Sequence, residues 1–180
     1  YQRAGTFLHN QIYSNATGVT TYTSNHGNMD FRQNLVYDNT NAAVIFSADD
    51  GGTFVGNTIY QSVGTALTIN GSTPNVLLRN NILQSDQGSI VTVTSSATGG
   101  SFDSDFNLFH RGTPAATLGE WGGAAATDLA AWVAASGEGE GSISAVPGFL
   151  DIDGADNVLG GLDTALGGGG AAPVGRAGCV

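Results

Sequence analysis

A short phrase that opens with Asn recurs through the first half of the chain. Each copy places an aliphatic residue two positions after the Asn, and three of the copies end in Tyr. The copies begin at Asn10, Asn34, Asn57 and Asn80, in steps of 24, 23 and 23 residues. A repeat of this length indicates a solenoid, because each unit is too short to bury a core alone and has to stack on its neighbours.

Aligning the copies on their Asn residues reveals further apolar columns. One column lies three residues before the Asn, one lies two residues after it, and one lies nine or ten residues after it. Their members are Phe7, Phe31, Phe54 and Leu77; Ile12, Val36, Ile59 and Ile82; and Val19, Val44, Leu67 and Ile90. Each unit thus offers three short apolar segments separated by polar corners, a pattern that indicates strands. Three strands in each repeat predict an all-β fold, a right-handed parallel β-helix of about five coils.

The repeated Asn residues are predicted to be structural. The apolar positions before and after each Asn have opposite parity, so a regular strand cannot place both on one face. The chain must therefore bend near the Asn, where an inward amide can bond backbone groups that the corner leaves unpaired. We call the stacked series of these Asn residues the Asn ladder. A fifth, imperfect coil follows, in which Phe106 takes the place of the ladder Asn and Asp103 falls in the column of Phe7.

The composition changes beyond the coils. Residues 127–137 predict a short helix, with Thr127 as its N-cap and Gly137 at its C-terminal end. A return strand and turn are expected over residues 142–149. The expected organisation is β-helix coils over residues 1–126, a helix and return strand packed on the solenoid over 127–153, and a Gly-rich tail over 154–180.

The Asn phrases, together with residues 104–109, 128–132 and 142–151, resemble the C-terminal part of right-handed parallel β-helix repeat proteins of the pectate-lyase-like superfamily. The resemblance covers about residues 5 to 153. Members of this superfamily include polysaccharide lyases, glycoside hydrolases and large secreted bacterial surface proteins. The resemblance therefore implies a fold and a secreted or cell-surface location, and it leaves several functions open, because fold does not imply function.

Charge narrows the range of partners. The chain has no Lys, five Arg and 15 acidic residues, which gives a net charge of −10. Such a surface repels phosphate, so we expect neither nucleic acid nor an anionic membrane as a partner. It also disfavours an anionic polysaccharide unless cations bridge the two. No stretch is long and apolar enough to span a membrane. The chain has no initiator Met or signal peptide, and we expect it to be a piece of a longer protein.

A polysaccharide lyase would need a base and positive charge beside a uronate carboxylate. In the lyases that this chain resembles, the base is Lys or Arg on the outer strand face, and the candidates here are Arg32 and Arg79. They stand at different offsets from their Asn residues, so we expect them to point differently. The alternative is that both are ordinary surface Arg residues.

A glycoside hydrolase would need clustered carboxylates. Asp49 and Asp50 form an acidic pair within the coils, but a Gly-Gly sequence follows them and favours a turn. Asp103 and Asp105 alternate around Ser104 and could face a common groove. The chain's His residues do not have the spacing of a zinc site.

Calcium is the better candidate among metal ions. Asp151, Asp153 and Asp156 alternate around a Gly at short spacing, as hard-cation loops do, although the bidentate Glu of an EF-hand is missing. The alternative is a solvated acidic loop.

Tyr13, Tyr37 and Tyr60 form an outward stripe in consecutive coils, and aromatic faces can stack on sugar rings. The alternative is a packed Tyr ladder. With Arg32 and Arg79, these residues are the candidate carbohydrate contacts. We therefore expect a non-catalytic module of a secreted or cell-surface bacterial protein, serving as a scaffold or a polysaccharide-binding surface. The alternative is the C-terminal half of a lyase or hydrolase whose catalytic coils lie upstream.

Overall fold

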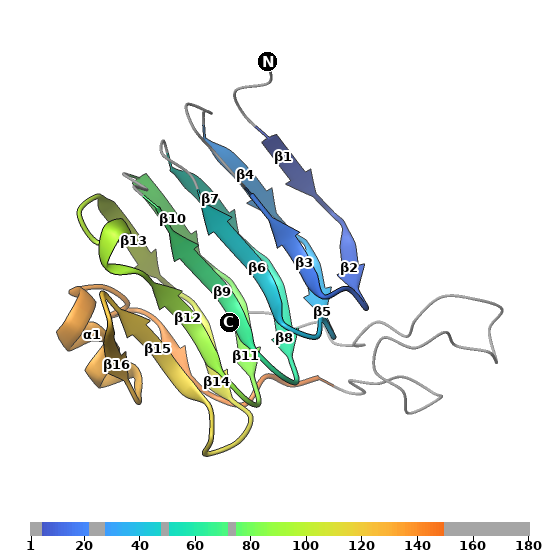
Figure 1. The fold of residues 1–180 in the computed structure, drawn as a ribbon. Helices are drawn as coiled ribbons and strands as arrows, with labels where there is room; N and C mark the ends of the chain where they lie inside the picture. Colours follow the sequence, from blue (N-terminus) through green and yellow to red (C-terminus); the bar gives the residue numbers. More distant parts are fainter. Residues whose placement is uncertain (1–4, 22–27, 48–50, 72–74, 150–180) are drawn as a thin grey trace, which may run out of the picture.

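The computed structural model describes residues 5–21, 28–47, 51–71 and 75–149. Three parallel sheets run the length of a solenoid, and each coil contributes one strand to each sheet (Figure 1). The first sheet has five strands: β1 (Gly5–Leu8), β4 (Met29–Arg32), β7 (Gly52–Val55), β10 (Asn75–Arg79) and β13 (Ser101–Asp105). This order confirms the predicted parallel β-helix, with about the expected number of coils.

In the other two sheets, as in the first, a strand pairs with the strand three places further along the chain, up to β15 and its partner β16. The second contains β2 (Gln11–Tyr13), β5 (Leu35–Tyr37), β8 (Thr58–Gln61), β11 (Ile82–Ser85), β14 (Leu108–Arg111) and β17 (Ile143–Ser144). The third contains β3 (Thr17–Thr20), β6 (Ala42–Ser47), β9 (Thr65–Asn70), β12 (Ser89–Val93), β15 (Thr117–Trp121) and β16 (Ala124–Ala126). Among the strands that the structure describes, all pairs are parallel except β15 with β16. A 3-10 turn (Ser95–Ala97) joins the third sheet to the last coil.

Stacking places like residues above like residues. Phe7, Phe31 and Phe54 are in register, and neighbouring rings in this column lie 5.7 and 5.5 Å apart. The side chains of Phe31 and Phe54 are almost fully buried. In the first three coils, all three predicted apolar columns therefore lie in the interior. They are the column of Phe7, Phe31 and Phe54, the column of Ile12, Val36 and Ile59, and the column of Val19, Val44 and Leu67.

The predicted register is wrong by one residue from the fourth coil onward. Ile82 pairs with Thr58, and Leu83 pairs with Ile59, so Asn81 rather than Asn80 continues the ladder. In the fifth coil Asn107 is the ladder residue, and Phe106 does not replace it. The doublet Asn80–Asn81 hides the shift, because either Asn fits the phrase when it is read from the sequence.

The same shift moves several side chains to the other face of the first sheet. Leu78 and Ser104, rather than Leu77 and Asp103, continue the column of Phe54. Asp103 pairs with Leu77 and lies on the outer face. In the third sheet Val91 takes the position predicted for Ile90, although both side chains are buried.

A cap closes the C-terminal end of the solenoid. The helix α1 (Leu129–Ser136) begins after Asp128, whose carboxylate accepts a hydrogen bond from the Ala131 N–H at 2.8 Å, so the N-cap is Asp128 and not Thr127. Gly137 ends it in the left-handed conformation, as predicted. A Cβ at Gly119 would lie 2.7 Å from the Trp132 ring, so the absence of a side chain there makes room for the helix.

Candidate functional site

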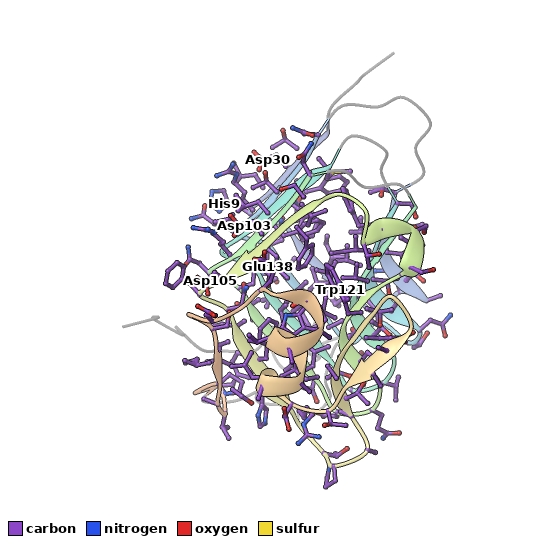
Figure 2. All side chains as sticks on the ribbon, turned by 90° about the vertical axis from the view of Figure 1, so that its left-hand side faces the viewer. His9, Asp30, Asp103, Asp105, Trp121 and Glu138 are labelled. Carbon is purple, nitrogen blue, oxygen red and sulfur yellow. The ribbon has the colours of Figure 1, made fainter. Side chains whose placement is uncertain are left out.

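The outer face of the first sheet carries two aligned columns of side chains. One contains Thr6, Asp30, Thr53, Leu77 and Asp103, and the other contains Leu8, Arg32, Val55, Arg79 and Asp105. Their alternation with buried neighbours is the period of a strand, whose successive side chains point to opposite faces. Figure 2 shows Asp30, Asp103 and Asp105 along the same side of the molecule, with His9 near them.

Arg32 and Arg79 share one outer column, with Val55 between them. The expectation that they point differently is wrong, because Arg79 stands two residues before the true ladder residue, Asn81, just as Arg32 stands two before Asn34. Each guanidinium is paired with a carboxylate. Arg32 donates from Nε to Asp30, while Arg79 binds Asp103 through two parallel bonds, Nε to Oδ1 at 2.9 Å and Nη2 to Oδ2 at 2.8 Å.

An exposed aromatic ring adjoins the Arg79–Asp103 pair. The guanidinium carbon of Arg79 lies 5.8 Å from the centre of the Phe106 ring, within the range of a cation–π contact. Phe106 is 53% exposed although it is a large apolar residue. It occupies the corner between β13 and β14 with a φ of 55°, which turns its side chain away from the core.

A hollow of about 430 Å³ opens beside this group. Its lining includes Arg79 and four carboxylates, those of Asp103, Asp105, Glu138 and Glu140. These acids come from β13 and from the loop after α1, so the cap and the last coil form the hollow together. One Arg among four carboxylates leaves a net negative charge around it.

Two of these carboxylates also join β13 to the loop that follows α1. Glu138 Oε2 accepts the Ser104 N–H at 3.2 Å, and Asp105 Oδ1 accepts the Gly141 N–H at 2.6 Å. Asp103 and Asp105 therefore do face a common hollow, but Asp103 binds Arg79 and Asp105 holds the cap loop. In the described ranges no group of three His, Cys, Asp or Glu side chains is placed to hold a metal ion.

The three predicted contact Tyr residues form an aligned column on the second sheet. The rings of Tyr13 and Tyr37 stack with centroids 5.0 Å apart, and the Tyr60 hydroxyl donates to Asp86 Oδ2 at 2.7 Å. Tyr37 and Tyr60 are buried, so Tyr13 is the member of the column that keeps an exposed part. A sugar-contact role for this column stays a prediction.

The Tyr37 hydroxyl is buried and has no hydrogen-bond partner among the described residues. Burial, and then the neighbouring Tyr13 and Asp38, raise the pKa of Tyr37 to about 12. Burial also raises the pKa of Asp38. On the same sheet, burial lowers the pKa of His110, and the charge of Asp86 opposes this effect.

Other predicted site residues lie outside the part of the chain that the structure describes. They are the acidic pair Asp49 and Asp50 and the candidate calcium ligands Asp151, Asp153 and Asp156. Within the described residues, no helix is long and apolar enough to cross a membrane.

Sequence reasoning missed Phe106 and Glu138 as site residues. Phe106 had been placed inside the coil, in the Asn ladder. Aligning the fifth coil on Asn107 would have put Phe106 at the outer corner, beside Arg79 of the preceding coil. Glu138 carries no such signal, because it belongs to the cap and reaches the hollow through tertiary packing.

Comparison with known proteins supports the fold. The family model described as the right-handed β-helix region matches residues 1–125, which is more than half of the chain. This match confirms the family indicated by the Asn phrases and is consistent with the pectate-lyase-like superfamily. Neither the curated proteins nor the solved structures that were compared gave a significant match.

Proposed function

Since this chain belongs to the right-handed β-helix family, we propose that it is a non-catalytic, polysaccharide-binding module of a secreted or cell-surface protein. The contact surface is the outer face of the first sheet near its last strands. The observation that carries the proposal is the arrangement of Arg79 between Asp103 and the exposed Phe106 ring, at the edge of the hollow.

The chemistry of this group suits a sugar. A bidentate Arg–Asp pair offers fixed donors and acceptors to hydroxyl groups, while the apolar face of an aromatic ring packs on the C–H face of a sugar ring. The negative charge around the hollow disfavours polymers of uronic acids, because their carboxylates would be repelled. A neutral polymer fits this surface best.

The pairing of both Arg candidates with carboxylates supports a binding role rather than a lyase role. A lyase base must reach a proton of the substrate in the transition state, and both guanidinium groups are already engaged by the carboxylates of Asp30 and Asp103. Calcium binding through Asp151, Asp153 and Asp156 is retained as a separate proposal, which rests on the spacing of these residues in the sequence.

Binding is tested with the full chain against xylan, soluble cellulose derivatives and pectate, by affinity electrophoresis and calorimetry. We expect a neutral polymer to bind and Phe106→Ala to weaken it about tenfold, the effect of losing one aromatic contact of about 1.4 kcal/mol. Arg79→Ala should weaken binding as well.

Val146→Ala is the matched control, since Val146 is an exposed apolar residue outside the strands of the first sheet. Binding to none of the polymers, or unchanged binding by Phe106→Ala, would contradict the proposal. Ultraviolet absorbance from unsaturated products during incubation with pectate would instead establish the lyase alternative.

A further inference from the structure

The two ends of the solenoid differ in how their strand edges are covered. Each sheet begins with a first-coil strand, β1, β2 or β3, and no strand among the described residues pairs with its outer edge. At the other end, β16 covers the third sheet, β17 covers the second and the loop carrying Glu138 covers the first. We call the free side of β1, β2 and β3 the N-terminal edge.

The Asn ladder has a direction. The side-chain oxygen of Asn34 accepts two hydrogen bonds from Asn10, one from its backbone N–H and one from its Nδ2, both at 2.9 Å. Asn57 accepts the same pair from Asn34 at 2.9 and 3.1 Å, and Asn81 accepts it from Asn57 at 2.9 and 3.0 Å. Each coil therefore donates towards the C-terminal end and accepts from the coil before it.

A second ladder at the next corner has the same direction. Asn39 Oδ1 accepts the backbone N–H and the Nδ2 of Asn15, both at 3.2 Å. The Asn39 N–H then donates to Gln61 Oε1 at 3.1 Å. The two ladders lie at the two ends of the second-sheet strands, so together they define the orientation of a coil.

Both ladders end in unused acceptors at the N-terminal edge. The Oδ1 atoms of Asn10 and Asn15 accept no hydrogen bond from the described residues, whereas their counterparts Asn34 and Asn39 accept two each. The apolar residue beside Asn10 is incompletely covered as well. Phe7 is partly exposed, while Phe31, which follows it in the column, is only 1% exposed.

We infer that the N-terminal edge is a docking surface for one further β-helix coil that runs in the same sense. Its donors would be an Asn or an equivalent amide above Asn10 and another above Asn15, each supplying a backbone N–H and a side-chain N–H. Its apolar side chains would cover Phe7 and continue the core.

A second copy of this chain does not fit this edge. Head-to-tail stacking finds no matching edge among the described residues, because the C-terminal end presents the antiparallel β16, the two-residue β17 and the loop of Glu138 in place of three parallel strands. Two N-terminal edges brought together would offer each other the unused Asn10 and Asn15 acceptors, with no side-chain donor at either ladder. The direction of the ladders thus selects a parallel coil over a symmetric dimer.

The test places a known coil on this edge. A copy of residues 51–74 replaces residues 1–3, so that Asn57 of the copy precedes Asn10 by 24 residues, the spacing between Asn57 and Asn81 in the chain itself. We expect the midpoint of thermal unfolding to rise by about 5 °C, since stacking a unit adds an interface to a repeat protein. Amide hydrogen exchange in β1, β2 and β3 should slow at least tenfold.

Two comparisons make the result specific. The same fusion with Asn57→Ala in the copied coil should lose at least half of the gain in midpoint, and the copied segment added in trans as a peptide should slow exchange in β1. An unchanged midpoint and unchanged exchange in both arms would overturn the inference. An equal rise in the unfolding midpoint with the Asn57→Ala fusion would also overturn it. So would a dimer of the full chain, seen by sedimentation, that the fusion abolishes.

Discussion

At the scale of single residues, the corner before each ladder Asn shows how local conformation is repeated. His9, Gln33, Asn80 and Phe106 occupy this corner with φ between 54° and 56°, and Gly56 has a φ of 68°. The left-handed conformation costs about 1 kcal/mol or more in a residue with a side chain. The ladder bonds of the following Asn offset this cost in every coil, so the corner does not require Gly.

The buried Tyr37 hydroxyl leads to a prediction about stability. An unpartnered buried hydroxyl is destabilising, so Tyr37→Phe should raise the free energy of unfolding by about 1 kcal/mol at pH 7. Urea denaturation followed by circular dichroism measures this change. Tyr13→Phe serves as a comparison from the same column, because the Tyr13 side chain is only partly buried.

The same variant should change the response of stability to alkaline pH. The pKa of Tyr37 is raised to about 12 in the folded state, above its ordinary value of 10.0, so folding favours the neutral form. The resulting stability is complete below pH 10 and is lost as pH rises towards 12. Tyr37→Phe should lack this part of the loss, and an identical pH profile for both proteins would contradict the assignment.

At the scale of elements, the Asn ladder joins neighbouring coils in addition to the three sheets. Asn57 accepts two bonds from Asn34 and donates from Nδ2 to the Phe31 carbonyl at 2.9 Å and to Asn81 Oδ1 at 3.0 Å. A buried side chain that bonds three neighbours in this way holds the corners of adjacent coils in register.

The loss of stability on replacing a ladder Asn should therefore depend on how far the residue lies from the exposed end of the ladder. Asn57→Ala leaves several buried groups unpaired and should lower the free energy of unfolding by about 3 kcal/mol. Asn10→Ala is the matched control at the exposed end of the ladder, where we expect about 1 kcal/mol or less. Equal losses in the two variants, measured by urea denaturation, would show that the position along the ladder is unimportant.

The contact between α1 and the last coil is a second feature at this scale. Gly119 continues the inward column of Val91, and Trp132 fills the space that a side chain would otherwise occupy. Trp132 also packs edge-on against Trp121, with ring centroids 5.8 Å apart. The cap is thus fitted to the core through one Gly and one Trp.

Gly119→Ala should weaken this fit. The added methyl group would overlap the Trp132 ring and the Val91 carbonyl, so we expect a loss of about 2 kcal/mol, typical of overpacking. Gly148→Ala is a control, because a Cβ there meets nothing within 4 Å. Thermal unfolding with Trp fluorescence reports both stability and the environment of Trp132, and an unshifted midpoint for Gly119→Ala would disprove the packing argument.

At the scale of the whole molecule, charge and shape act together. The chain carries a net charge of −10, and its outer face ends in a hollow lined by four carboxylates and one Arg. Cations and neutral polymers are the partners that such a surface tolerates best. The proposed calcium loop and the proposed sugar surface are both consistent with this charge.

Removal of calcium tests the first of these proposals. If Asp151, Asp153 and Asp156 hold an ion, EGTA should lower the midpoint of thermal unfolding by about 5 °C, and excess CaCl₂ should restore it, since a ligand of the native state stabilises by mass action. Asp153→Ala should respond to neither reagent. A midpoint that is indifferent to EGTA in the unaltered chain would rule out a tightly bound structural ion.

The sequence alone was sufficient to predict the parallel β-helix, the stacking of like residues and the cap helix. These features follow from a repeat that recurs in every coil, because one unit can bury its apolar side only against the next. The family match over residues 1–125 confirms the β-helix, and the structure confirms the helix beyond it.

Only the tertiary structure decided the register of the last two coils and therefore the candidate site. A shift of one residue exchanges the two faces of a strand, and the doublet Asn80–Asn81 fits the phrase in either register. The structure thus brought Arg79, Asp103 and Phe106 together on the outer face, and it showed that Tyr37 is buried. Local repeats determine what stacks, whereas the contacts between coils and cap determine which side chains remain outside.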